Sequence, residues 1–142
     1  MRTGALAAAR LLAGALALAA LAGCGGRGLY WPVIPPDLPP PRVVDDAANG
    51  SSVDLVRTQW LLVRLPVAAD GYTWSYDVGG DRNLYPSGES PRFEPADGSG
   101  RSVIFTFRAE GTGTSSLRFA YRNADAPQMP PARSVAFDVV AR

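Results

Sequence analysis

Side chains able to carry out chemistry are sparse in this chain, which has 142 residues, no histidine and one cysteine. Without histidine, neither a Ser-His-Asp nor a Cys-His arrangement can supply its general base. Zinc lacks its two usual ligand types, and we expect no metal and no other cofactor. A pair of carboxylates, as in glycoside hydrolysis, could still act, but the 13 acidic residues are scattered over turn-like segments. The composition therefore predicts that the protein is not an enzyme.

The single cysteine follows a segment with the features of an export signal. Arg2 and Arg10 precede an apolar run over residues 11–21, which is shorter than the about 20 residues that span a bilayer. A charged start, a short apolar stretch and a small-residue cleavage site are typical of a secretory signal peptide. The sequence Leu21-Ala22-Gly23-Cys24 resembles the lipobox of bacterial lipoproteins.

The lipobox resemblance implies that Cys24 receives a lipid and becomes the first residue of the mature chain. We therefore expect residues 1–23 to be a signal peptide, and the protein to be held at a membrane of the cell envelope through the lipid on Cys24. In a bacterium with two membranes, Gly25 after the cysteine favours the outer membrane, on its periplasmic side or its surface. An ordinary signal peptide beside an unrelated cysteine is the alternative.

The charge balance argues against a nucleic-acid partner. Without Arg2 and Arg10, the basic side chains number 12, against 13 acidic ones. Nucleic-acid binding requires a basic face, and no such excess is present. A chain of this length predicts one folded domain, which we expect to be a monomer.

Proline marks the segment that precedes this domain. Six prolines lie between residues 32 and 41, and proline favours the extended polyproline II conformation over helix or central strand. We predict a tether over residues 24–49, beginning at the lipidated cysteine, and a folded domain over residues 50–142.

Within that domain, apolar and polar residues alternate with a period of two. Short, β-branched or aromatic runs are separated by clusters of glycine, proline and aspartate, which predicts strands at residues 59–65, 72–76, 101–109, 115–122 and 134–140, with weaker ones at 53–56 and 83–87. About seven antiparallel strands in roughly 90 residues are typical of an immunoglobulin-like β-sandwich, an all-β fold. The expected core contains Trp74, Phe105, Phe107, Phe119 and Phe137.

Three sequence segments occur in an order that can be compared with a known family. They are Gly71-Tyr72-Thr73-Trp74 after a short loop, Phe105-Thr106-Phe107-Arg108-Ala109 followed by Gly113-Thr114, Leu117, Tyr121 and Arg122, and the closing run from Pro131 to Val139. Together they resemble the chagasin family of cysteine-protease inhibitors, over about residues 53–142. The resemblance implies an immunoglobulin-like sandwich in which three loops occlude the active-site cleft of a papain-like cysteine protease, without a bond to the catalytic thiol.

The resemblance implies which residues of this sequence correspond to the three loops. The first comprises Val67, Ala68, Ala69, Asp70 and Gly71; the second Gly98, Ser99, Gly100 and Arg101; the third Arg122, Asn123, Ala124 and Asp125. Of the family's Asn-Pro-Thr-Thr-Gly loop only Gly71 is kept, two glycines of Gly-x-Gly-Gly are kept, and the aromatic residue of the third loop has no counterpart. The glycines are equally explained by turn geometry. The alternative function is therefore a chagasin-fold binding or structural module of the cell envelope that inhibits nothing.

Overall fold

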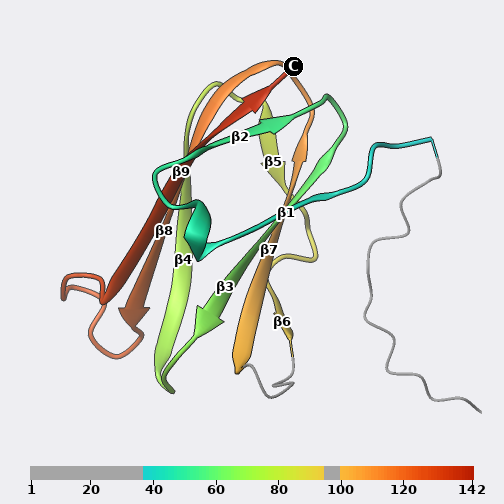
Figure 1. Ribbon diagram of the computed structural model, residues 1–142. Coiled ribbons are helices and arrows are strands. Elements are labelled where there is room, and N and C mark those ends of the chain that lie inside the picture. The colour runs from blue at the N-terminus through green and yellow to red at the C-terminus, as the bar shows by residue number, and fades with distance from the viewer. Residues whose placement is uncertain (1–36, 95–99) are drawn as a thin grey trace, which may run out of the picture. The chain divides into compact units, whose positions relative to one another are not determined.

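Two sheets packed face to face form the folded part of the protein, for which a computed structural model describes residues 37–94 and 100–142 (Figure 1). Cys24, with the predicted signal peptide, and Gly98 and Ser99 lie outside the described residues. Among the residues that are described, no helix is long and apolar enough to cross a membrane. The single helical element in this part of the chain is a 3-10 turn, η1 (Asp46–Ala48).

The first sheet has the order β1-β3-β7-β5, with β6 also paired to β7. Its strands are β1 (Arg42–Asp45), β3 (Trp60–Val67), β5 (Leu84–Pro86), β6 (Arg92–Glu94) and β7 (Arg101–Ala109). The second sheet has the order β2-β9-β8-β4. It comprises β2 (Ser52–Leu55), β4 (Tyr72–Gly80), β8 (Gly113–Asn123) and β9 (Arg133–Ala141). The predicted β-sandwich is confirmed, and all seven predicted strands are present.

Two strand pairs differ from the predicted antiparallel arrangement. β1 runs parallel to β3, and β2 runs parallel to β9. The spacing of turns predicts antiparallel pairing only for strands that follow each other closely in the chain. β1 and β2 instead join the edges of different sheets, each beside a strand that comes later in the sequence, so no turn signal predicts their direction.

The folded part also begins earlier than the sequence predicts. Residues 42–45 pair with Leu61, Leu62, Val63 and Arg64 of β3, although the prediction placed them in the tether. Val44 lies opposite Val63 and packs against the core. A strand of four residues after a proline-rich stretch has too short a pattern to be distinguished from extended linker, and its place in the sheet depends on long-range pairing.

The core lies between the sheets and contains the five aromatic residues that were predicted for it. Trp74, Phe105, Phe107, Phe119 and Phe137 are all buried. The Phe105 and Phe119 rings lie 5.2 Å apart and the Phe119 and Phe137 rings 6.1 Å apart, within the range of favourable aromatic packing. A tightly packed interior of this kind gives the connections at the ends of the sandwich a rigid support.

Candidate functional site

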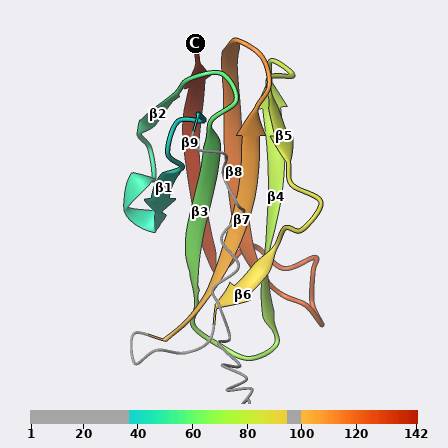
Figure 2. The same ribbon diagram turned by 90° about the vertical axis from the view of Figure 1, so that its right-hand side faces the viewer.

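Two connections lie at one end of the sandwich, which we call the loop end: residues 68–71 between β3 and β4, and residues 124–132 between β8 and β9. The end of β6 and the start of β7 lie at this end as well (Figures 1 and 2). Strand register places them there. Val67 at the end of β3 pairs with Arg101 at the start of β7, and Tyr72 at the start of β4 pairs with Asn123 at the end of β8. The strands that support the predicted first and third loops therefore end side by side.

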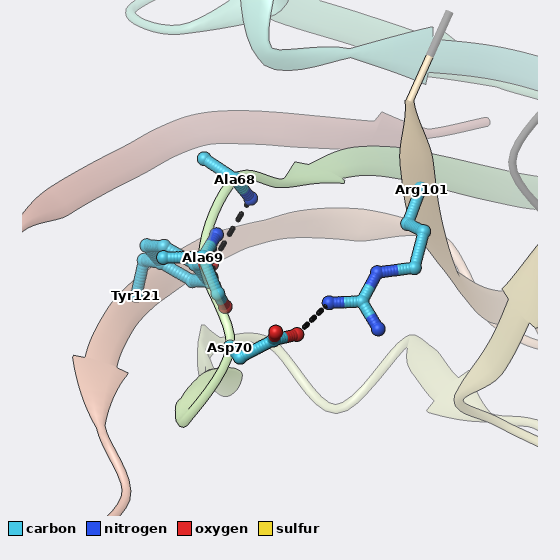
Figure 3. A network of polar contacts seen from close by, with 5 residues as sticks. All are labelled: Ala68, Ala69, Asp70, Arg101 and Tyr121. Atoms are coloured by element: carbon cyan, nitrogen blue, oxygen red, sulfur yellow. Dashed lines mark hydrogen bonds and ion pairs between the residues drawn. The ribbon is translucent and has the colours of Figure 1, made fainter. Parts of the chain in front are cut away.

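The first loop is held by one tyrosine side chain (Figure 3). The backbone N–H groups of Ala68 and Ala69 each donate to the Tyr121 hydroxyl at 3.1 Å, and this hydroxyl donates to the Ala69 carbonyl at 3.2 Å. A hydroxyl can accept two hydrogen bonds and donate one, so all three hydrogen bonds of the Tyr121 hydroxyl are made with the loop backbone. The alanine side chains form no hydrogen bonds, and the loop is shaped through its main chain.

The tyrosine is itself fixed from the core side. Its ring is buried and lies 5.3 Å from Tyr72 and 4.9 Å from Trp74. The Trp74 indole N–H donates to the carbonyl of Pro66 at 2.8 Å, just before the loop. Because these three rings lie on the paired strands β4 and β8, the second sheet supports the first loop.

Gly71, which ends the first loop, has a backbone φ of 77°. That conformation strains residues with a Cβ, so glycine suits it. A Cβ built on Gly71 would meet nothing within 4 Å, and the same holds for Gly100, with φ of 100°. Turn geometry thus explains both glycines, and the space around them is open.

Two polar contacts connect the first loop to its neighbours. The Asp70 carboxylate forms an ion pair with the Arg101 guanidinium at the start of β7 (Figure 3). On the other side, the Ala124 N–H donates to the Gly71 carbonyl at 2.8 Å. The first loop is therefore central, with β7 contacted on one side and the third loop on the other.

The third loop is longer than the predicted segment that ends at Asp125. The side chain of Asn123 accepts a hydrogen bond from the Asp125 N–H at 2.9 Å, and the Arg122 guanidinium donates to the carbonyl of Met129 at 2.6 Å. The carbonyl of Tyr121 accepts from the Ala132 N–H at 2.8 Å, where the chain returns toward β9. Asp125 is exposed, and Met129 has 57% of its surface accessible.

The structure thus brings together most of the residues predicted for the site. The first loop, Arg101 of the second and the predicted residues of the third lie at one end and are connected through the contacts above, and Gly100 precedes β7 directly. Two further side chains at this end, Phe93 and Met129, were not predicted. Each is a single apolar residue beside polar ones, without a periodic pattern that could have indicated it.

The chemistry available at the loop end is that of a docking surface. Within residues 37–94 and 100–142, no group of three or more His, Cys, Asp or Glu side chains could hold a metal ion. The central loop presents exposed small side chains and its backbone, on a scaffold that holds them in one conformation. Such a projection is suited to entering a cleft on another protein.

Comparison with known proteins identifies the family. The model of the chagasin family peptidase inhibitor I42 matches residues 61–139, more than half of the sequence, and the chain belongs to this family. Its members are protease inhibitors and not enzymes, in agreement with the prediction from composition. No curated protein matches the sequence.

Solved structures with the same fold include the cysteine protease inhibitor EhICP2 from Entamoeba histolytica, with 14% identity, a TM-score of 0.62, and coverage of 72% of this chain and 96% of that one. Amebosin has 16% identity, a TM-score of 0.50, and coverage of 73% and 100%. A structure of PbICP-C in complex with falcipain-2 has 12% identity, a TM-score of 0.48, and coverage of 71% and 99%. At these identities, the likeness to EhICP2 and Amebosin concerns the fold alone.

Proposed function

We propose that the protein is a lipid-anchored inhibitor of papain-like cysteine proteases, in which the first loop enters the active-site cleft and the other two contact its walls. Membership of the chagasin family supports this partner class. The observation that carries the proposal is the central loop itself, where the exposed residues Ala68 and Ala69 are held by hydrogen bonds to Tyr121.

Preorganisation is the physical reason that this loop suits inhibition. A loop that is ordered before binding loses less conformational entropy when it enters a cleft. Two alanines add little width, so the main chain can approach a narrow cleft closely. No side chain of the first loop needs to react, since occlusion alone prevents a substrate from reaching the catalytic thiol.

A non-inhibitory module of the cell envelope is the second candidate. It is favoured by the absence of the family's Asn, Pro and Thr residues from the first loop and of an aromatic residue at the predicted third-loop position, where the exposed Asp125 stands. Aromatic residues often dominate the energy of interfaces, and one lost anchor of about 2–4 kcal/mol weakens binding by roughly thirty- to a thousand-fold. We therefore expect only weak inhibition of papain itself.

The test is an inhibition assay with the full-length chain in detergent, titrated into papain and into papain-like proteases from the same habitat. Ala69→Arg adds bulk at the tip of the central loop and should weaken inhibition by about a hundredfold or more, because the side chain no longer fits the cleft. Ala47→Arg is the matched control, since Ala47 is also exposed but lies in η1. Both variants should melt at the wild-type temperature. Absence of inhibition against every such protease, at high micromolar inhibitor, would favour the non-inhibitory module.

The anchor is tested separately, because it does not depend on inhibition. Replacing Cys24 by serine removes the thiol that the lipobox chemistry requires. We expect the wild-type chain to fractionate with membranes, in a two-membrane bacterium with the outer one, and Cys24→Ser to accumulate as uncleaved precursor. Recovery of the wild-type chain as a soluble product, or with lipid on another residue, would contradict the anchoring.

A further inference from the structure

Two exposed apolar side chains distinguish the loop end from the rest of the described surface. Phe93 has 71% of its surface accessible and Met129 has 57%, more than the other large exposed apolar residues of the described chain, which are Val43, Val56, Tyr76 and Tyr85. A single exposed apolar residue is ordinary. Here the two most exposed ones lie at the same end as the first and third loops, Phe93 on β6 of the first sheet and Met129 in the β8–β9 connection.

Phe93 lies on strand β6, which pairs with β7. It pairs with Val103, whose side chain is buried, so the two side chains share a face of the first sheet. The neighbouring residues are both in ion pairs, Arg92 with Glu89, and Glu94 with Arg64 at 2.6 Å. The pairing of β6 with β7 thus holds the backbone of Phe93, while its ring is exposed to solvent.

Met129 is held in a comparable way on the other side. Its carbonyl accepts the hydrogen bond from the Arg122 guanidinium at 2.6 Å, and its N–H donates to the carbonyl of Ala126 at 3.1 Å. The backbone at this position is therefore ordered by two contacts, while the side chain is free to meet a partner. Methionine adapts its shape readily to an apolar surface.

The central loop lies between these two positions. It contacts Arg101, at the start of the strand that pairs with β6, through Asp70. It contacts the third loop, which carries Met129, through the Gly71 carbonyl. Figure 1 shows the β8–β9 connection on one side of the β3–β4 connection and the ends of β6 and β7 on the other.

We propose that Phe93 and Met129 are the apolar contacts that grip the two walls of the protease cleft around the first loop, with Phe93 as the main anchor. The proposal rests on the proposed function and specifies what the flanking regions recognise, which is an apolar surface on each side of the cleft. Phenylalanine and methionine are both enriched at the centre of interfaces. The main anchor accordingly lies on strand β6, and not in the third loop where the family carries its aromatic residue.

The experiment first titrates the wild-type full-length chain in detergent into papain and into papain-like proteases from the same habitat. The four variants are then compared with wild type against the protease that the wild-type chain inhibits most strongly. We expect Phe93→Ala to raise the inhibition constant at least about thirtyfold and Met129→Ala about three- to tenfold, as for a dominant and a secondary interface residue. Tyr85→Ala and Val56→Ala are matched controls of similar exposure outside the loop end, and should stay within about twofold. All four should melt close to the wild-type temperature, because the replaced side chains are exposed.

The outcomes separate this inference from the proposed function. If the wild-type chain inhibits and Phe93→Ala inhibits equally well, the inference is wrong while the inhibitor function stands. If the wild-type chain inhibits no papain-like protease, the function fails and the inference fails with it. A loss of binding to lipid vesicles in Phe93→Ala, with unchanged inhibition, would assign the two side chains to the membrane and also overturn the inference.

Discussion

The two ends of the sandwich are ordered by different means. At the end opposite the loops, which we call the closed end (residues 80–83 and 113–115), the Ser115 hydroxyl donates to the Asp81 carbonyl at 2.6 Å and the Thr114 N–H donates to the Asp81 carboxylate at 2.9 Å. Asn83 and Ser115 are buried there. At the loop end, one hydroxyl, that of Tyr121, holds an exposed backbone.

The glycines of the two ends show the difference most clearly. A Cβ on Gly80 would lie 2.6 Å from the Thr114 carbonyl oxygen, and one on Gly113 would lie 2.4 Å from the Asp81 carboxylate. The glycines of the loop end, Gly71 and Gly100, have nothing within 4 Å of this position. The closed end is packed against itself, whereas the loop end is ordered and still has free space around it, which a binding surface requires.

The largest expected effect comes from alanine substitution of glycine at each end. Both Gly80 and Gly71 have positive φ, of 86° and 77°, and an alanine there costs about 1–2 kcal/mol at either position. Gly80→Ala additionally overlaps a backbone oxygen, and overpacking adds about 1–3 kcal/mol. Chemical denaturation should therefore show Gly80→Ala to be clearly less stable than Gly71→Ala. Equal losses would mean that the closed end is not more tightly packed.

A smaller effect on stability is expected when the Tyr121 hydroxyl is removed. Tyr121→Phe loses the hydrogen bonds to Ala68 and Ala69 but keeps the ring in the core, so the free energy of unfolding should fall by about 1 kcal/mol. Amide hydrogen exchange at Ala68 and Ala69 should become faster, and inhibition weaker, because the loop is no longer preorganised. The control is Tyr76→Phe, at an exposed tyrosine of the β4 strand. Unchanged exchange at both alanines would show that the hydroxyl does not order the loop.

The smallest effect is expected for the ion pair between Asp70 and Arg101. Both side chains are largely exposed, at 93% and 53%, and exposed pairs contribute less than about 1 kcal/mol and are screened by salt. Arg101→Ala should change the melting temperature little, and the difference from wild type should vanish at high salt. A large, salt-independent loss would instead mean that Arg101 supports the loop by packing.

The strands and the core could be predicted from the sequence because a strand with one buried face alternates apolar and polar residues along the chain. Phe119 and Phe137 are buried and Arg118 is exposed, as the alternation indicates. The pattern was less informative for Leu62, which is buried although it lies on the outer face of the first sheet, opposite Thr106. Alternation states which face a residue occupies, but whether that face is covered depends on neighbouring strands.

The sequence alone, then, determined the sandwich, the five aromatic residues of its core and the resemblance to the chagasin family. Only the tertiary structure decided the parallel pairing of β1 with β3. It also decided the hydrogen bonds between the Tyr121 hydroxyl and loop residues more than 50 positions away, and the position of Phe93 and Met129 at the same end of the sandwich. The physical reason is the range of the interactions. Strand periodicity and turn chemistry act between near neighbours in the chain, whereas these contacts join segments that only the packed sheets bring together.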